Sequence, residues 1–217
     1  MRLAVIMAIH YTHGWTQRLC KSYIEHMDQP LIVFDNNPVS DQYIKNTRGH
    51  RGESESWNKM CQEESSYVRN LDRTTVIDVP RPTESTYELP THGDVLDFAF
   101  QWCLEQKYDA IMHIEPDCNI KSNKWFNQMV SKIKDNWAVG QGVIHKEGPY
   151  VMPLCPTLWM IQKTLDLGIT FNRHKPDINT AQKTLRECEQ QGKLGSVRAD
   201  GFIHYGNGTK KQPFLMP

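Results

Sequence analysis

The sequence lacks a long hydrophobic run, an excess of charge of one sign, and a Cys-x-x-Cys motif. No stretch of about 18 apolar residues occurs, so we expect no membrane-spanning helix. The 25 Lys and Arg residues balance the 25 Asp and Glu residues, which excludes a global field that would attract nucleic acid. The six cysteines have no histidine at a zinc-like spacing; this pattern indicates reduced thiols and a cytoplasmic location, and argues against a zinc site.

The length and composition are typical of one globular domain. A chain of 217 residues can bury a substantial core without a second domain. Its 39% hydrophobic and 23% charged residues are ordinary for such a protein. We therefore expect a single domain over residues 1–217.

The first 35 residues have the pattern of a strand, a helix and a second strand. Residues 3–9 are an apolar run of strand length, residues 15–26 have helical spacing, and residues 31–35 are apolar again and end in Asp35. This order predicts a parallel pair with a helical crossover. The expected fold class is α/β, with a mostly parallel central sheet flanked by helices.

A second helix and strand follow further along the chain. Thr91 and Asp94 have the spacing of a capping box before the apolar residues 95–104, and the apolar strand 110–114 comes next. That strand ends in Glu115 and Asp117. Because parallel strands deliver their carboxyl ends to one edge of a sheet, we expect the polar residues after the three strands to lie at that edge.

Further elements are expected on both sides of this helix and strand. Residues 57–61 suggest a short helix and residues 74–79 a strand, in a segment of which part is expected to form a loop over the ligand site of the sheet. Residues 138–144 and 157–161 are strand-like, and residues 179–188 are helical.

Glu115 and Asp117 are candidate ligands of a divalent cation. Mg²⁺ and Mn²⁺ prefer oxygen ligands, commonly one or two carboxylates together with water and substrate phosphates. The alternative is a polar turn after a strand, since Pro-Asp is a common turn pair and Pro116 precedes Asp117.

The order and spacing of these motifs resemble the nucleotide-sugar glycosyltransferases of the GT-A fold, particularly the large family two type. Residues 32–37, Ile-Val-Phe-Asp-Asn-Asn, are similar to a Val-Val-Asp-Asn-like strand end, and residues 114–117, Ile-Glu-Pro-Asp, are similar to a Leu-Asp-x-Asp-like motif. Residues 124–129 are similar to the helix that follows with a Trp. The resemblance covers residues 3–40 and 91–130, with a weaker match over residues 155–209.

The resemblance implies a nucleotide-binding role for residues at the ends of the first two strands. Ala8, His10 and Tyr11 would contact the base and ribose, largely through backbone groups. Asp35 would accept a hydrogen bond from the base; capping of the next turn is the competing explanation. Asp94 or Asp97 would lie near the ribose or the sugar.

The resemblance also implies a metal and diphosphate site built partly from the end of the chain. Asp117 would be the main ligand of Mn²⁺ or Mg²⁺, and Glu115 would contact either the ribose or the metal. His204 would be a third ligand or a donor to the diphosphate. The backbone N–H groups of Gly206 to Thr209 would approach phosphate oxygens, as glycine-rich nests do.

The sequence departs from the pattern of that family at the position of the catalytic base. Inverting members carry an Asp at the start of the helix that corresponds to residues 179–188, and the aligned position here lies near Ala181. Asp177 is the nearest carboxylate upstream and is the proposed base; a helix-capping role is the alternative. The family favours inversion, and a retaining enzyme would not need this base.

The implied activity is metal-dependent hexosyl or pentosyl transfer from a nucleotide diphosphate sugar, with a UDP-sugar favoured, to an acceptor hydroxyl. Residues 1–120 would bind the donor, and residues 121–217 would bind the acceptor and close the metal site. The acceptor could be a glycan, a lipid or a nucleic acid.

Three alternative functions stay open. The first is a nucleotidyltransferase, which residues 10–14, with one Gly and no Lys, disfavour. The second is a glycosyltransferase that acts on modified DNA bases, and the third is a non-catalytic nucleotide-sugar-binding module.

Overall fold

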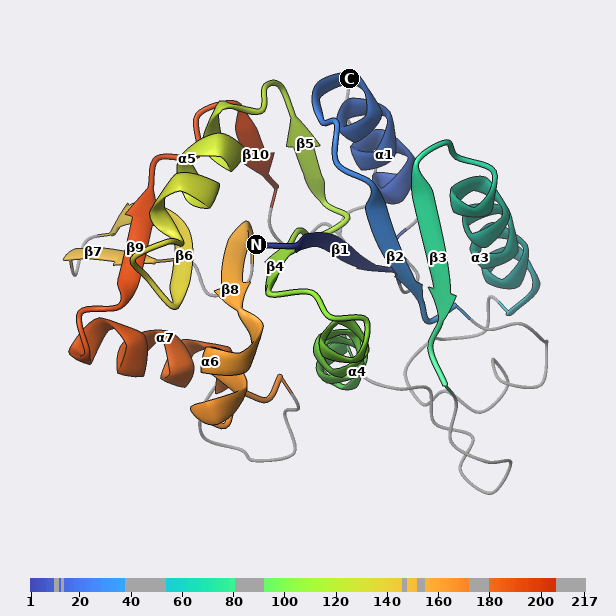
Figure 1. Cartoon of the computed structure of the whole chain (residues 1–217). Helices are drawn as coiled ribbons and strands as arrows, with labels where there is room; N and C mark the ends of the chain where they lie inside the picture. The colour runs from blue at the N-terminus through green and yellow to red at the C-terminus, as the bar shows by residue number, and fades with distance from the viewer. Residues whose placement is uncertain are drawn as a thin grey trace.

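The computed structural model describes residues 1–9, 12, 14–37, 54–80, 92–145, 148–151, 155–171 and 180–205. These residues form one α/β unit, with a central sheet and helices on both of its faces (Figure 1). The predicted fold class is confirmed.

The described helices are α1 (Trp15–His26), α3 (Ser54–Arg69), α4 (His92–Glu105), α5 (Lys124–Lys132), α6 (Ile161–Asp166) and α7 (Thr180–Gln190). The described strands are β1 (Leu3–Ile9), β2 (Leu31–Asp35), β3 (Thr74–Asp78), β4 (Ala110–His113), β5 (Cys118–Ile120), β6 (Ala138–His145), β7 (Gly148–Val151), β8 (Thr157–Met160), β9 (Leu194–Val197) and β10 (Phe202–His204).

Within the described residues, the main sheet has eight strands and is parallel in its N-terminal half. Its order is β3-β2-β1-β4-β8-β6-β7, and β9 pairs with β6 outside this path. The pairs β3–β2, β2–β1 and β1–β4 are parallel, as is β6–β9, whereas β8 runs antiparallel to β4 and β6, and β7 runs antiparallel to β6. The predicted parallel β1–α1–β2 unit is therefore present.

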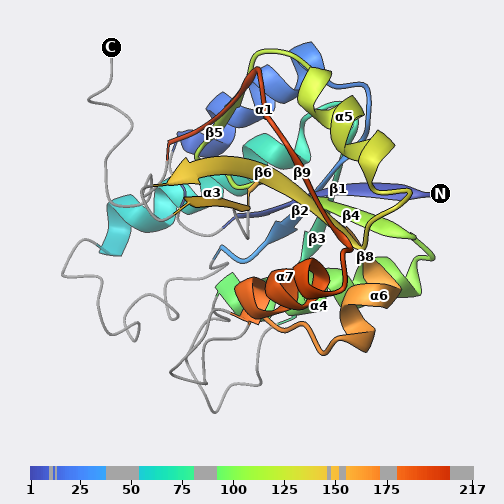
Figure 2. The ribbon, with the colours of Figure 1, turned by 90° about the vertical axis from the view of Figure 1, so that its left-hand side faces the viewer.

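The alternation of side chains along β1 builds two hydrophobic layers. Val5, Met7 and Ile9 belong to the cluster that α1, α3 and α5 complete, whereas Ile6 and Ala8 belong to the cluster under α4, α6 and α7. Because successive side chains of a strand point to opposite faces, one apolar run can supply both layers. Figure 2 shows the two groups of helices on either side of the sheet.

Helix α1 packs as its sequence spacing predicts. Trp15, Leu19 and Tyr23 are buried, at positions that recur every four residues. Gly14 precedes the helix with a left-handed φ of 63°, and the helix ends where the N–H of Met27 donates to the carbonyl of Tyr23.

A second, two-stranded sheet joins the end of the chain to the segment that follows β4. Strands β5 and β10 are antiparallel, and His204 faces Cys118 across the pair. The ring of Phe202 packs on Trp125 of α5, with centroids 4.7 Å apart, and the N–H of Ile120 donates to the Ser22 hydroxyl of α1. This small sheet fixes β10 beside the carboxyl end of β4.

The boundaries differ from the sequence expectations in two places. Helix α3 spans 16 residues, more than the short helix predicted around residues 57–61, because Cys61, Glu64 and Val68 continue one buried face. The strand predicted over residues 157–161 ends at Met160, where α6 begins. The loop predicted over the ligand site of the sheet lies largely outside the described residues.

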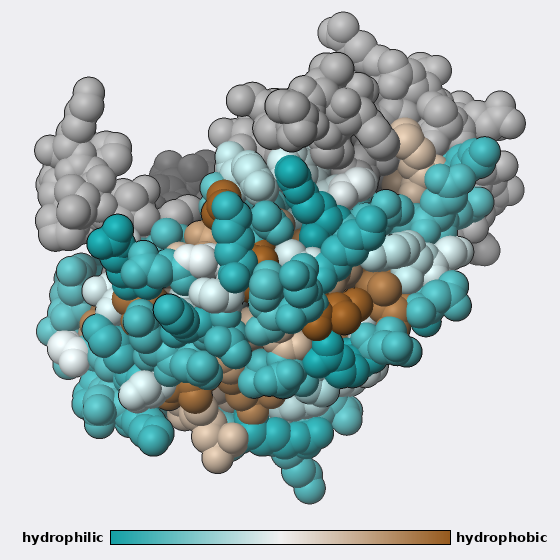
Figure 3. Space-filling view, turned by 90° about the horizontal axis from the view of Figure 1, so that it is seen from above, coloured by the Kyte–Doolittle hydropathy of each residue, from teal (hydrophilic) through white to brown (hydrophobic). Residues whose placement is uncertain are grey.

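The described surface is mostly polar. The face seen in Figure 3 is largely hydrophilic, with a few small hydrophobic groups between the polar ones. Among the large hydrophobic side chains that the structure describes, only that of Met1 is exposed. None of the described helices combines the length and the hydrophobicity that crossing a bilayer would need.

A substitution at Gly201, in the turn that leads into β10, tests how much this turn contributes to the stability of the protein. Its φ is +86°, and an added Cβ would lie 2.2 Å from the Ser122 hydroxyl and 3.2 Å from the Ser122 backbone nitrogen. We expect Gly201→Ala to lower the free energy of unfolding by about 2 kcal/mol or more, because strain and a clash add together. Urea denaturation measures this change.

Gly168→Ala is the matched control for the turn. Gly168 also has a left-handed φ, of +70°, but an added Cβ would meet no atom within 4 Å. It should cost only the conformational strain, about 1 kcal/mol. Equal losses in the two variants would contradict the proposed clash at Gly201.

Candidate functional site

The carboxyl ends of β1, β2 and β4 lie side by side at one edge of the sheet. Beyond the ladder itself, the N–H of Asn36 donates to the carbonyl of Ile9, and the N–H of Ile114 donates to the carbonyl of Ile6. These bonds continue the parallel pairing past the last residues of the strands. The segments that follow β1, β2 and β4 therefore begin at a common edge, where α/β sheets bind their ligands.

Three of the predicted metal ligands meet at this edge. Nε2 of His204 lies 2.8 Å from Oε2 of Glu115 and 3.3 Å from Oδ1 of Asp117. One potential ligand atom from each residue lies within 4.8 Å of the other two. Glu115 and Asp117 come from the turn after β4, and His204 comes from β10. The structure brings these three residues together, and their role as metal ligands stays a prediction.

The three side chains are largely shielded from water and their charges depend on one another. The side chains of Glu115, Asp117 and His204 are 20%, 13% and 15% exposed. Burial lowers the pKa of His204, but hydrogen bonds from the imidazolium to Asp117 and Glu115 more than reverse this and raise the pKa to about 11.

Glu115 shows the complementary effect. Burial alone would raise the pKa of its carboxyl group, but the hydrogen bond from His204 and the nearby imidazoles of His113, His204 and His92 bring the pKa below its ordinary value. The carboxylate is therefore ionised at neutral pH. The pocket thus contains two carboxylates and one imidazolium. A metal ion bound there would take over from the imidazolium proton as the positive charge next to the carboxylates.

The spacing of the donor atoms fits a small divalent cation. Ligand atoms at neighbouring corners of an octahedral Mg²⁺ site, each about 2.1 Å from the ion, lie about 3 Å apart. The distances from Nε2 of His204 to the Glu115 and Asp117 oxygens, 2.8 Å and 3.3 Å, match this value. Two carboxylates and one imidazole would hold Mn²⁺ or Mg²⁺ and leave positions for water or phosphate. His204 must release its proton before it can bind the metal.

Asp35 lies in the same edge, at the end of β2, and is 5% exposed. Its Oδ1 accepts a hydrogen bond from the N–H of Asn37 at 3.0 Å, and its Oδ2 accepts one from Arg69 of α3 at 3.2 Å. Arg69 also pairs with Asp78 at the end of β3. Counting the contacts within the described part of the chain, each carboxylate oxygen keeps a second acceptor position, so these contacts orient Asp35 without excluding a ligand N–H.

Glu64 is a polar residue of this region that sequence reasoning missed. It lies on the buried face of α3 and is 4% exposed. Its oxygens accept hydrogen bonds from the Thr12 hydroxyl at 2.9 Å and from the Asn37 amide at 3.3 Å. Burial raises the pKa of Glu64, and hydrogen bonds from Thr16, Thr12 and Asn37 oppose that rise. The sequence offered one signal for this residue: a carboxylate stands between Cys61 and Val68 on the face of α3 that is otherwise apolar.

The two acidic residues predicted near the ribose or sugar differ in their surroundings. The carboxylate of Asp97 accepts hydrogen bonds from the Thr170 hydroxyl at 2.6 Å and from the N–H of Phe171 at 2.7 Å, so it ties α4 to the segment after α6. Asp94 lies in the first turn of α4 and is half-buried. Of the two, Asp97 has a clear structural role. The predicted ligand contact of either residue stays a prediction.

The remaining predicted site residues fall into two groups. Ala8 lies in β1 with its side chain buried against the α4 layer, and its predicted backbone contact with a nucleotide stays a prediction. The other five lie outside the described residues: His10, Tyr11, Asp177, Gly206 and Thr209. Their roles stay predictions.

The sequence matches no protein-family model and no curated protein, but the fold is similar to solved structures. S. aureus TarS in complex with UDP-GlcNAc has a TM-score of 0.58 and 9% identity, over 97% of this chain and 61% of that chain. The mannosyltransferase PcManGT from Pyrobaculum calidifontis, in complex with GDP-Man and Mn²⁺, has a TM-score of 0.55 and 9% identity, over 91% and 55%. The 4-diphosphocytidyl-2C-methyl-D-erythritolsynthase from Anaerococcus prevotii has a TM-score of 0.53 and 8% identity, over 91% and 86%.

These likenesses confirm the GT-A fold that the sequence motifs predicted. At such low identity they establish the fold alone. The chain spans about three fifths of the length of the TarS 1-349 fragment that is in complex with UDP-GlcNAc and just over half of the length of PcManGT. These similarities therefore do not establish the activity, the donor or the acceptor of this chain.

The imidazolium of His204 gives the metal-free protein a specific pH dependence. In the unfolded chain a histidine loses its proton near pH 6.5, whereas His204 keeps it to about 11. Its stabilising effect is fully present below 6.5 and is lost as the pH rises through about 11. Within this window the free energy of unfolding should fall by up to about 1.4 kcal/mol per pH unit for this one proton.

We expect His204→Gln to make the decline between about pH 7 and about pH 9 shallower, as measured by urea denaturation in the presence of a chelator. His26→Gln, at a half-buried histidine at the end of α1, is the control and should keep the wild-type slope. An unchanged slope in His204→Gln would contradict the imidazolium assignment.

Proposed function

We propose that this protein is a metal-dependent glycosyltransferase that moves a sugar from a nucleotide diphosphate sugar to an acceptor hydroxyl. The observation that carries the proposal is the convergence of Glu115, Asp117 and His204 at the carboxyl edge of a GT-A fold. Asp35 lies at the same edge, two strands along from β4. A site of this kind can hold a cation next to a phosphate-bearing ligand whose base is bound nearby.

Asp117 and His204 would hold Mn²⁺ or Mg²⁺. Glu115 would either be a further ligand of the ion or contact the ribose. Bound there, the cation would supply charge stabilisation to the leaving nucleotide diphosphate. The residues that would hold it are themselves held in place, because the turn after β4 and the β5–β10 pair form backbone hydrogen bonds. The N–H of Tyr205 donates to the carbonyl of Asp117 at 3.0 Å and extends this frame.

The N-terminal half, residues 1–120, would bind the donor, for which a UDP-sugar is favoured. Asp35 would accept from the base, and the backbone near Ala8, His10 and Tyr11 would contact the base and ribose. Asp94 or Asp97 would lie near the ribose or the sugar; the carboxylate of Asp97 also accepts two protein hydrogen bonds, which would orient it.

The C-terminal half, residues 121–217, would bind the acceptor and complete the diphosphate site through Gly206 to Thr209. The acceptor could be a glycan, a lipid or a nucleic acid. Transfer with inversion is proposed, with Asp177 as the base. The six cysteines are free thiols, as expected for the cytoplasmic location that we propose.

A nucleotidyltransferase is the second candidate, favoured by the fold similarity to the erythritolsynthase. Such an enzyme would use a nucleoside triphosphate and release pyrophosphate. The two functions differ in their small-molecule products, so one set of assays separates them.

Asp117→Asn tests the metal assignment. We expect a loss of sugar transfer of at least about 100-fold and the loss of Mn²⁺-dependent nucleotide-sugar binding, because one ligand loses its charge. Donor hydrolysis and thermal shift with UDP-sugars, with and without Mn²⁺, measure the two effects. Circular dichroism checks that the variant is folded.

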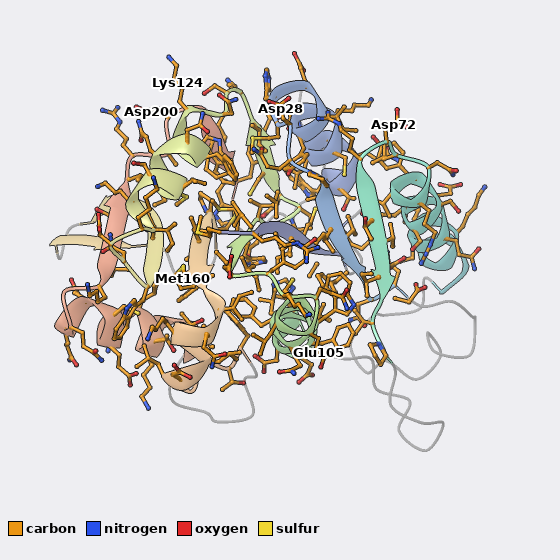
Figure 4. The ribbon with its side chains drawn as sticks, viewed as in Figure 1. Asp28, Asp72, Glu105, Lys124, Met160 and Asp200 are labelled. Atoms are coloured by element: carbon orange, nitrogen blue, oxygen red, sulfur yellow. The ribbon has the colours of Figure 1, made fainter. Side chains whose placement is uncertain are left out.

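Asp72→Asn is the matched control. Asp72 precedes β3 at the opposite edge of the sheet and is exposed at the periphery (Figure 4). It should keep wild-type transfer and binding. Full activity in Asp117→Asn would refute the metal role, and pyrophosphate release from a nucleoside triphosphate without sugar transfer would favour the nucleotidyltransferase.

Asp35→Asn tests the base contact. Asparagine keeps the shape and one acceptor oxygen but loses the charge that pairs with Arg69. We expect a rise in KM for the donor of about tenfold with kcat nearly unchanged, because the base lies away from the bond that reacts. A fall in kcat with an unchanged KM would show that Asp35 acts on the reaction itself.

Asp177→Asn tests the base. Loss of a general base should lower kcat by about 100-fold or more without a change in donor affinity. Loss of a helix cap would instead cost about 1 kcal/mol of stability and leave turnover nearly intact. Measuring kcat and Tm together separates the two roles, and NMR of the product's anomeric configuration tests inversion directly.

A further inference from the structure

Two cysteines lie directly beside the triad and have no role in the function proposed above. Sγ of Cys118 and Sγ of Cys155 are 3.2 Å apart, and both residues are fully buried as free thiols. One potential ligand atom each from Cys118, Cys155 and His204 lies within 4.8 Å of the other two. His204 therefore belongs to two clusters, one with carboxylates and one with thiols.

The fold explains why these three residues converge. Cys118 is the first residue of β5 and faces His204 across the antiparallel pair, so the two side chains project to the same side of the small sheet. Cys155 comes from the segment before β8, whose first residue, Thr157, faces the last residue of β4. Its Sγ accepts a hydrogen bond from the N–H of Glu115 at 3.1 Å. This bond would stabilise negative charge on the sulfur.

We propose that Cys118, Cys155 and His204 form a second cation site, selective for a thiophilic divalent ion of the Zn²⁺ class. Two thiolates and one imidazole are the donor set that such ions prefer, and a fourth position would take water. Each thiol gives up its proton to solvent on binding, so two thiolates and a dication form a centre with no net charge. A neutral centre is the form that a buried position tolerates best.

The distances permit this site after a small adjustment. Two sulfurs at the usual zinc–sulfur distance of about 2.3 Å and at a tetrahedral angle lie about 3.8 Å apart. The observed 3.2 Å must therefore widen by about half an ångström. Cys118 is the first residue of a three-residue strand, and the widening would come from rotation about its side chain and that of Cys155.

The two cation sites exclude each other, because they share His204. A neutral imidazole has one nitrogen with a free lone pair, so it can bind one cation at a time. Nitrogen and sulfur donors also bind Zn²⁺ more tightly than Mn²⁺. A thiophilic ion should therefore withdraw His204 from Glu115 and Asp117 and release Mn²⁺. The cation site does not rest on the proposed function; only the inhibition of transfer that would follow does.

Co²⁺ is the probe that reports sulfur ligands directly, through absorption from sulfur-to-cobalt charge transfer. We expect the whole protein, reduced with a phosphine, to develop this band with about one equivalent of Co²⁺, and Zn²⁺ to remove it. Cys118→Ala and Cys155→Ala should each weaken Co²⁺ binding by about tenfold or more. Cys118→Ser and Cys155→Ser serve if the alanine variants do not fold.

Cys103→Ala and Asp117→Asn are the controls. Cys103 is as deeply buried but lies on α4, in the layer across the sheet, so its loss should leave the band unchanged. Asp117→Asn removes a ligand of the Glu115–Asp117–His204 cluster and none of the Cys118–Cys155–His204 cluster. It should therefore also keep the band. Absence of the band in the wild-type protein, or its survival in both cysteine variants, would overturn the proposal.

Electron paramagnetic resonance of free Mn²⁺ tests the exclusion between the sites. In wild type, about one equivalent of Zn²⁺ should release bound Mn²⁺, whereas the cysteine variants should need about tenfold more. Equal Zn²⁺ requirements would overturn the exclusion. If no sugar transfer is found, the Co²⁺ result is unaffected; if no Co²⁺ band is found, the Asp117→Asn test of transfer still stands.

Discussion

The candidate site depends on one short stretch of antiparallel pairing. Strand β10 pairs with β5 over three residues, and this pairing brings His204 from near the end of the described chain to the turn that carries Glu115 and Asp117. Gly201 turns the chain into β10 in a left-handed conformation, and Phe202 packs on Trp125. The chemistry at the edge of the sheet thus rests on a few backbone hydrogen bonds and on the aromatic contacts of Phe202 with Trp125 and of Tyr205 with Trp15.

The charges of Glu115, Asp117 and His204 stabilise one another even without a bound metal ion. Two carboxylates that are mostly shielded from water repel each other and lose hydration, so they need a cation nearby. His204 supplies it as an imidazolium, which is why its pKa is raised to about 11. A metal ion would replace one cation by another of higher charge. The same imidazole also lies within reach of two thiols, which offer a different cation a different set of ligands.

Much of the fold and part of the site could be predicted from local sequence. Apolar runs of strand length predicted β1, β2, β4, β6 and β8, and helical spacing predicted α1, α4 and α7. Glu115 and Asp117 could be named because they directly follow a strand. The resemblance to GT-A enzymes supplied His204. By contrast, the partners of Asp35 and the role of Glu64 were not visible, because α3 has to pack before its side chains meet those of β2.

The sequence by itself determined the parallel half of the sheet and the acidic turn after β4, because periodicity and strand ends are local properties. Only the tertiary structure decided which distant residues complete the site. Cys118, Cys155 and His204 have no metal-binding spacing along the chain, and they meet because β5 pairs with β10 while β8 pairs with β4. Contacts of this kind follow from strand pairing and layer packing, which depend on the whole chain rather than on any single segment.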